Sequence, residues 1–184
     1  PRGDLVQQAS YKLGMALLLS GERETAEETF TSVINRYRNG QWVALAAYRL
    51  AAQLYNRKEW VAAVPYFAIA GKEAADKELA HKAIFYESRC LQMAGRSEQA
   101  IKRLKDIVGD NANPYRDYAR LAIGELFARQ DKHEEALRHF EILLVPSVAP
   151  QERAQALLAA GVSAAKLGQQ PKARDFLNRT LESA

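Results

Sequence analysis

The sequence has few of the residues that stabilise small disulfide-rich or metal-bound domains. Its 184 residues include one cysteine, Cys90, which excludes a disulfide within the chain. Of the three histidines, His81, His133 and His139, the last two are six residues apart, whereas paired metal ligands on one helix face are four apart. The histidines are expected to be solvated at helix starts and faces. No apolar run approaches the roughly 18 residues of a membrane-spanning helix. We therefore expect no metal site and no membrane span in this segment.

Groups suited to catalysis are also scarce. The ten glycines are scattered singly, so no glycine-rich loop is present to hold a phosphate group. The adjacent pairs Glu27-Glu28 and Glu134-Glu135 would point about 100° apart on a helix and cannot converge on one bond. Cys90 directly precedes Leu91, a predicted core residue, which favours a semi-buried small hydrophobe over a nucleophile. The sequence therefore predicts a protein that is not an enzyme and needs no cofactor.

Charges of the two signs nearly balance. Lys and Arg number 26 and Asp and Glu 22, for a formal net charge of +4, and the pI is about 9.2. Acidic residues are interleaved through the most basic stretch, residues 96–132, and dilute its attraction for phosphate groups. Nucleic acid is therefore not the favoured partner, and an RNA-binding helical repeat is kept only as a third hypothesis.

The residues that are abundant indicate helices arranged as repeats. Apolar residues recur at helical spacing, and no sustained alternation typical of strands is present, so we predict an all-α chain. Alanines recur at intervals of 36 or 37 residues, at Ala26, Ala63, Ala100, Ala136 and Ala173. Twelve residues before each lies a small residue: Gly14, Ala51, Ser88, Gly124 and Gly161. Four residues after each lies a bulky one: Phe30, Phe67, Leu104, Phe140 and Leu177. Such a period predicts about five stacked helix pairs, each with a helix A and a helix B, or about ten helices.

The recurring small residues, alanines and bulky residues also predict how the two helices of each pair pack. The small residue of helix A and the alanine of helix B are expected where the two backbones approach most closely, at roughly 8–10 Å between axes. The bulky residue is expected to fill the space between repeats. Gly21, Gly95 and Gly168 share one repeat position, which predicts a left-handed residue at the end of helix A. Pro65 falls inside the second helix B and should kink that helix or delay its start.

Two repeats carry a motif that resembles the tetratricopeptide repeat (TPR): Leu13-Gly14, Leu17, Gly21, Ala26 and Phe30 in the first, and Ile123-Gly124, Phe127, Ala136 and Phe140 in the fourth. The resemblance covers residues 7–184 and implies a right-handed α-solenoid with repeats at about 7–43, 44–80, 81–116, 117–153 and 154–184. Residues 1–6 are expected to end a preceding element. Because the chain starts at Pro1 and its last helix lacks a polar cap, we expect a piece of a longer protein.

This sequence departs from the usual TPR pattern in three ways. The period is 36–37 residues rather than 34, the early tryptophan is absent, and Glu87 takes the place of a leucine. The longer period is similar to that of bacterial cell-envelope repeat proteins, which suggests the bacterial periplasm or envelope as its location.

The resemblance implies which residues face the inner, concave side of the array. Of these we predict a partner-binding surface formed by Tyr11, Met15, Tyr48, Tyr55, Lys82, Phe85, Arg89 and Tyr118. Further positions implied to face inward are Gln8, Leu18, Leu45, Ala52, Gln92, Leu121, Glu125, Ala128, Gln155, Leu158, Val162 and Ala165. The leading hypothesis is a protein–protein interaction scaffold that binds a peptide or protein segment in this groove. The alternative is a structural spacer or self-association segment of a larger envelope protein.

Overall fold

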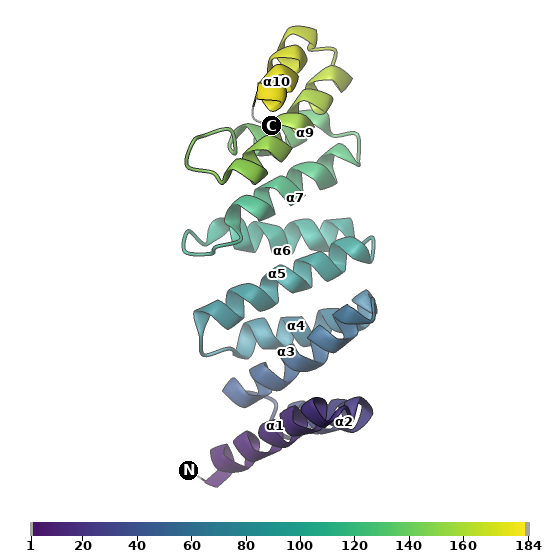
Figure 1. Ribbon diagram of the computed structural model, residues 1–184, viewed down its shortest axis with the longest axis vertical. Coiled ribbons are helices and arrows are strands. Elements are labelled where there is room, and N and C mark those ends of the chain that lie inside the picture. The colour runs from purple at the N-terminus through teal and green to yellow at the C-terminus, as the bar shows by residue number, and fades with distance from the viewer. Residues whose placement is uncertain (1, 183–184) are drawn as a thin grey trace. The chain divides into compact units, whose positions relative to one another are not determined.

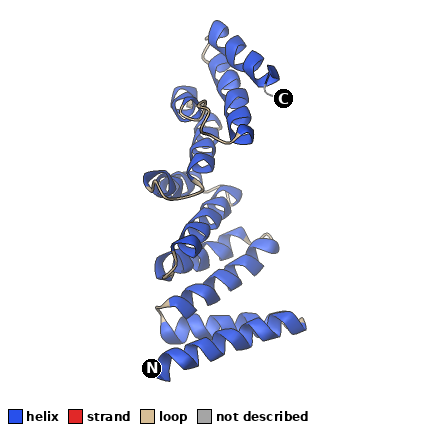
Figure 2. Cartoon of the chain, turned by 60° about the vertical axis from the view of Figure 1, so that its left-hand side comes forward, coloured by secondary structure: helices blue, strands red, loops and turns tan. Residues whose placement is uncertain are grey.

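The computed structural model describes residues 2–182, with side chains from residue 3, and every regular element in that range is a helix (Figures 1 and 2). The ten helices are α1 (Arg2–Ser20), α2 (Arg23–Tyr37), α3 (Gln41–Asn56), α4 (Trp60–Glu73), α5 (Lys77–Met93), α6 (Ser97–Gly109), α7 (Arg116–Ala128), α8 (His133–Glu141), α9 (Pro150–Lys166) and α10 (Gln170–Glu182). The prediction of an all-α chain with about ten helices is confirmed. Residues 2–6 are continuous with α1, and the division of the chain into repeats stays a prediction.

The helices form two compact units, Pro1–Ala100 (unit 1) and Ile101–Ala184 (unit 2), which divide within α6. In unit 1 each helix from α1 to α4 packs on the next, and α1 also contacts α3. In unit 2, α7 packs on α8, α8 on α9, and α9 on both α10 and α7. Fully buried side chains anchor each unit, such as Phe30 and Phe67 in unit 1 and Phe140 in unit 2. Burying one such ring stabilises the fold by roughly 2–3 kcal/mol.

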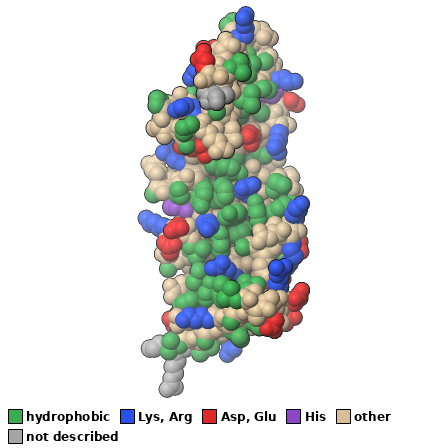
Figure 3. Space-filling model, in the orientation of Figure 1, with side chains coloured by type: hydrophobic (Ala, Val, Ile, Leu, Met, Phe, Trp, Pro, Cys, Tyr) green, Lys and Arg blue, Asp and Glu red, His purple; other side chains and the backbone are tan. Residues whose placement is uncertain are grey.

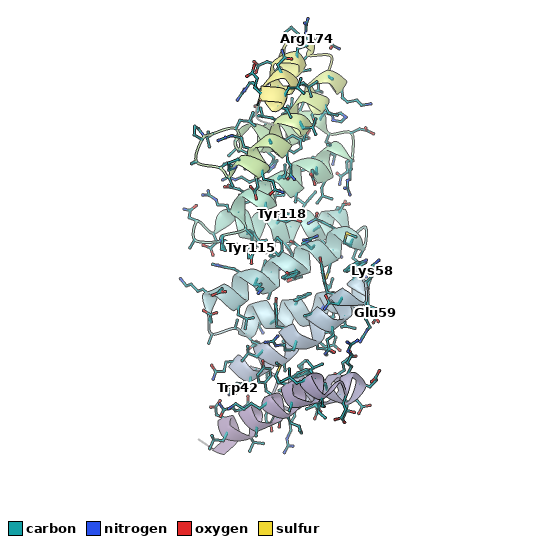
Figure 4. All side chains as sticks on the ribbon, in the orientation of Figure 1. Trp42, Lys58, Glu59, Tyr115, Tyr118 and Arg174 are labelled. Atoms are coloured by element: carbon teal, nitrogen blue, oxygen red, sulfur yellow. The ribbon has the colours of Figure 1, made fainter. Side chains whose placement is uncertain are left out.

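Each helix A ends on a left-handed residue, as the shared glycine position predicts. Gly21, Gly95 and Gly168 have φ angles of 89°, 71° and 73°. The same position in the second and fourth repeats is occupied by Lys58 and Asp131, with φ angles of 63° and 58°. Lys58 lies in the turn before α4 (Figure 4). The backbone geometry is therefore kept even where a side chain makes it unfavourable.

The glycines at the small position of the A helices lie directly against the bulky residues of the B helices, and Gly161 also lies close to the backbone oxygen of the repeat alanine Ala173. A Cβ atom added to Gly14 would lie 2.5 Å from Cε1 of Phe30, and one added to Gly161 would lie 2.7 Å from Cγ of Leu177. In the first and fifth repeats the bulky residue thus lies against the small residue of its own repeat, which must be small because the buried side chain occupies the place of a Cβ. The bulky residue also reaches between repeats as expected, since Phe67 stacks on Tyr86 of the next repeat with ring centroids 5.6 Å apart.

Pro65 does not delay the start of α4. The helix begins at Trp60, three residues before its repeat alanine, and α2 begins at the equivalent position. Pro65 lies inside the helix and is exposed. Since proline lacks an N–H, the helix lacks one backbone hydrogen bond at this point.

Candidate functional site

The A helices of unit 1 present a surface rich in aromatic rings, which we call the helix-A face of unit 1 and define by α1, α3 and α5. An aromatic cluster occupies it and the helix beneath, formed by Tyr48, Tyr55, Trp60, Phe67, Phe85 and Tyr86. The ring centroids of Tyr55 and Tyr86 lie 5.2 Å apart, and those of Phe67 and Tyr86 are stacked at 5.6 Å. Phe67 is 1% exposed, whereas both tyrosines are half-buried. The cluster is thus anchored in the core and partly open to a partner.

A hollow of about 120 Å³ opens in this cluster. Its walls are formed by six residues: Tyr48, Ala52, Tyr55, Asn56, Phe67 and Tyr86. The volume equals about four water molecules at roughly 30 Å³ each, or one bulky apolar side chain. Because four of the six walls are aromatic rings, the hollow suits an apolar group better than a polar one.

Two cations lie beside the hollow. Nζ of Lys82 is 5.9 Å from the ring centroid of Tyr48, and Cζ of Arg89 is 5.8 Å from that of Phe85. Both distances are within the range of a cation–π contact. Figure 3, which views α3 and α5 from the front, shows apolar side chains across these helices with Lys and Arg among them and acidic side chains toward the edges. The surface is therefore both aromatic and positively charged.

The structure brings together only part of the predicted surface. Tyr48, Tyr55, Lys82, Phe85 and Arg89 lie in or beside the aromatic cluster. Each of these five side chains is half-buried and retains exposed atoms.

Of the other three predicted residues, two belong to α1 of unit 1 and one belongs to unit 2. Tyr11 is 9% exposed and packs in the core against Trp42, with ring centroids 5.6 Å apart, so little of it is open to a partner. Met15 is half-buried against the same core. Tyr118 is a half-buried residue of α7 in unit 2 (Figure 4). The set as predicted is therefore not one continuous surface of unit 1.

Sequence reasoning missed Tyr86, which forms a wall of the hollow. It is four residues after Lys82 and so lies on the same side of α5, one turn further on. The four-residue spacing from Lys82 is therefore a sequence signal that could have predicted Tyr86 as part of the partner-binding surface. The contributions of Trp60 and Phe67 carried no such signal, because they come from α4, a helix B.

Unit 2 contains a larger hollow, of about 460 Å³, against α7 and α9. Five of the positions that the resemblance implies to face inward line it: Glu125, Ala128, Gln155, Leu158 and Val162. Leu158 and Val162 are 51% and 50% exposed and form an apolar wall. Surrounding protein raises the pKa of Glu125 by desolvation, which nearby Arg129 partly opposes. Leu121, also implied to face inward, is instead 4% exposed and lies in the core.

A third hollow lies on the other side of unit 1, between the B helices α2 and α4. It measures about 670 Å³, with Glu24, Glu27 and Glu28 on one wall and Ala62 and Tyr66 on the other. Glu27 is already bound by Arg57, whose Nη2 donates to its Oε2 at 3.1 Å. The hollow is shallow, acidic and distinct from the helix-A face.

The remaining titratable groups are more buried than expected. His133 is 12% exposed at its side chain, and His139 stacks on Phe127 with ring centroids 5.7 Å apart, so the expectation of solvated histidines is wrong for both. Burial and the charges of Lys105, Arg120 and Arg138 lower the pKa of His139.

Cys90 lies fully in the core, at 0% exposure, rather than being semi-buried. Burial, reinforced by Glu87, raises the pKa of its thiol to about 12. Among the described residues, no three His, Cys, Asp or Glu side chains are grouped to hold a metal ion. No helix within 2–182 is long and apolar enough to cross a membrane.

Comparison with known proteins supports the repeat interpretation. A family model described as tetratricopeptide repeat matches residues 8–40 and 155–184. Among solved structures, the MamA protein is similar with a TM-score of 0.74 at 15% identity, over 96% of this chain and 91% of that one. YrrB, described as a TPR protein with an unusual peptide-binding site, has a TM-score of 0.72 at 19% identity, over 95% of this chain and 84% of its own.

A third similar structure is MamA from Desulfovibrio magneticus RS-1, with a TM-score of 0.70 at 15% identity, over 96% of this chain and 94% of that one. At these identities the likeness concerns the fold. No curated protein sequence matches significantly.

Proposed function

We propose that this chain is a non-catalytic scaffold of the tetratricopeptide-repeat type that holds a peptide or protein segment against the helix-A face of unit 1. The family-model matches at residues 8–40 and 155–184 and the similar folds support this proposal. The observation that carries this proposal is the aromatic hollow of about 120 Å³ between Tyr48, Tyr55 and Tyr86. Aromatic side chains that are anchored on one side and open on the other are frequent hot spots in protein interfaces. The peptide-binding site described for YrrB is consistent with a peptide ligand on this fold.

The mechanism is presentation of side chains on a rigid support, without a chemical step. Phe67 holds the tyrosine rings from below, so little conformational entropy is lost when a partner contacts them. One bulky apolar side chain of the partner fills the hollow, and its neighbours lie along α3 and α5. Binding in the micromolar range, about −8 kcal/mol, is expected for a contact of this kind.

The proposal is tested by filling the hollow without removing any ring. Ala52 forms part of its wall on α3, and leucine is a good helix former. Peptides selected from a random display library on the native chain are titrated against Ala52→Leu by fluorescence anisotropy. We expect affinity to fall at least about tenfold, or ~1.4 kcal/mol, because the leucine occupies the space of the partner's side chain.

Ala62→Leu is the matched control, because Ala62 is an exposed alanine of α4 that lines the hollow between the B helices. It should bind the selected peptides like the native chain. If Ala52→Leu binds normally and Ala62→Leu does not, the partner lies on the B helices and the proposed face is wrong. Selection of no peptide at all would also count against the proposal.

A further inference from the structure

The cations beside the aromatic hollow are not paired with carboxylates of residues 3–182, unlike several other cations of this chain. Arg57, Arg103, Lys172 and Arg179 each pair with a carboxylate. Within the described part of the chain, neither Lys82 nor Arg89 forms an ion pair with Asp or Glu; each lies over an aromatic ring instead. The helix-A face thus carries positive charge that its own carboxylates do not neutralise.

The two acidic residues of α5, Glu78 and Glu87, do not neutralise these cations at the surface. Glu78 is exposed one turn before Lys82, but among the described side chains it forms no ion pair with it. Glu87 lies between the two cations in sequence, but it is 6% exposed and belongs to the buried side of the helix. On α3, Arg49 is exposed, and its Nε donates to Oη of Tyr11 at 3.4 Å rather than to a carboxylate. Lys82 and Arg89 therefore lie beside the open rings, and Arg49 adds a further cation to the helix-A face.

Both α5 cations are connected to the hollow through one ring each. Lys82 lies over Tyr48, which lines the hollow. Arg89 lies over Phe85, whose ring centroid is 5.2 Å from that of Tyr86, another wall. A group seated in the hollow is thus flanked by positive charge on both sides.

The spacing of these cations sets the spacing of the carboxylates that would meet them. Lys82 and Arg89 are seven residues apart on one helix, which corresponds to about 10 Å along its axis. An extended chain rises roughly 3.3 Å per residue, so two acidic side chains about three residues apart span the same distance. A partner lysine would instead meet like charge, and the nearby cation–π positions are already occupied.

We infer that the segment held on the helix-A face of unit 1 is acidic: it places a bulky apolar side chain in the aromatic hollow and side-chain carboxylates against Lys82 and Arg89. This inference rests on the proposed function and adds the chemical class of the partner. Recognition then combines a contact that salt does not weaken, in the hollow, with one that salt does weaken, at its rim.

The test uses three short peptides that differ only in charge. Each has a central leucine and blocked ends, and the residues that flank the leucine are glutamate, glutamine or lysine. We expect the glutamate peptide to bind the full chain about three- to tenfold more tightly than the glutamine peptide, and the lysine peptide to bind least. The difference should shrink in 1 M salt, where the screening length is ~3 Å.

Charge reversal on α5 tests whether Lys82 and Arg89 are the residues that favour the glutamate peptide. The double variant Lys82→Glu, Arg89→Glu should bind the glutamate peptide about five- to twentyfold more weakly, the scale of two partly exposed ion pairs replaced by repulsion. It should also gain affinity for the lysine peptide, an effect that simple loss of structure cannot produce. Arg36→Glu is the control, because Arg36 lies over the ring of Tyr37 at 5.6 Å on α2, away from the hollow. It should change neither affinity.

The outcomes separate this inference from the function on which it rests. If the three peptides bind equally and Ala52→Leu still weakens them, the scaffold function stands and the acidic partner is wrong. If none of the three binds although the random library yields a peptide sensitive to Ala52→Leu, the acidic partner is wrong and the scaffold function stands; if the library also yields none, both are wrong. If the glutamate peptide binds only with an unblocked C-terminus, the helix-A face binds a chain-terminal carboxylate, and the inference of an internal acidic segment is overturned.

Discussion

Replacing Gly124 by alanine should destabilise unit 2, although alanine is the better helix former. Gly124 lies on α7 against Phe140 of α8. An added Cβ would be 2.8 Å from both Cδ1 and Cζ of that ring and would contact Cε1 more closely still. Carbon atoms in good contact lie about 3.5–4.0 Å apart, so the ring must retreat by roughly 1 Å. Phe140 is 0% exposed, and the hollow against α7 and α9 that it lines gives it only partial room to move.

The size of the effect follows from two opposing contributions. Alanine in place of glycine inside a helix gains about 1 kcal/mol. Overfilling a packed core costs about 1–3 kcal/mol. The expected net loss in the free energy of unfolding is therefore about 1 kcal/mol. This net value corresponds to a steric cost of about 2 kcal/mol, below the upper end of the range, because Ala51 and Phe67 occupy the equivalent positions in the second repeat and are accommodated there.

Gly109→Ala provides the matched comparison in the same unit. Gly109 is the last residue of α6, and an added Cβ would meet nothing within 4 Å. This variant should gain about 0.5–1 kcal/mol. Denaturant unfolding followed by far-UV circular dichroism, with fits that allow the partial cooperativity of repeat arrays, measures both variants. If Gly124→Ala is stabilised as much as Gly109→Ala, the close approach of α7 and α8 is not a constraint and the reasoning is refuted.

Three further outcomes are expected. Lys58→Gly should raise the free energy of unfolding by about 1 kcal/mol and Gly95→Ala should lower it by a similar amount, because both sites require a left-handed backbone; equal effects of the two changes in urea unfolding would contradict this. Cys90 should resist iodoacetamide at pH 9 in the folded protein and react once the protein is unfolded. Because burial raises the pKa of the thiol to about 12, the folded state keeps a proton that the unfolded state loses. The free energy of unfolding should therefore fall as the pH rises above about 9. Because the pKa of His139 is lowered in the fold, the neutral histidine stabilises the folded state above about pH 6.5, and this stability is lost as the pH falls below that ordinary value. In chemical unfolding at pH 7.5 and pH 5, the native chain should therefore lose more stability than His139→Phe. An identical loss in both would assign the pH dependence to other groups.

The sequence was sufficient for the fold because one geometric requirement recurs at a fixed period. The glycines at 21, 95 and 168 predicted a left-handed helix end, and the structure has it there. The same end at Lys58 could be placed only by counting residues, since lysine does not favour that geometry, whereas aspartate at 131 tolerates it better than most side chains.

The candidate site was less predictable, since a repeat register gives the direction of a side chain and not its depth. Tyr11 occupies a position implied to face inward, yet Trp42 from the following helix pair covers it. Tyr86 falls outside the register but lines the hollow. Exposure depends on neighbours about 30 residues away in the chain, and a motif read along one helix contains no information about them.

The aromatic cluster also makes the molecule its own optical sensor. Trp60 lies with its ring centroid 4.9 Å from that of Tyr55, a wall of the hollow, and the only other tryptophan of the sequence is Trp42. Replacing Trp42 by phenylalanine would leave a single indole, separated from any bound group by one ring. Its emission would then report whether the hollow is occupied, without a dye and without altering any residue that forms the wall.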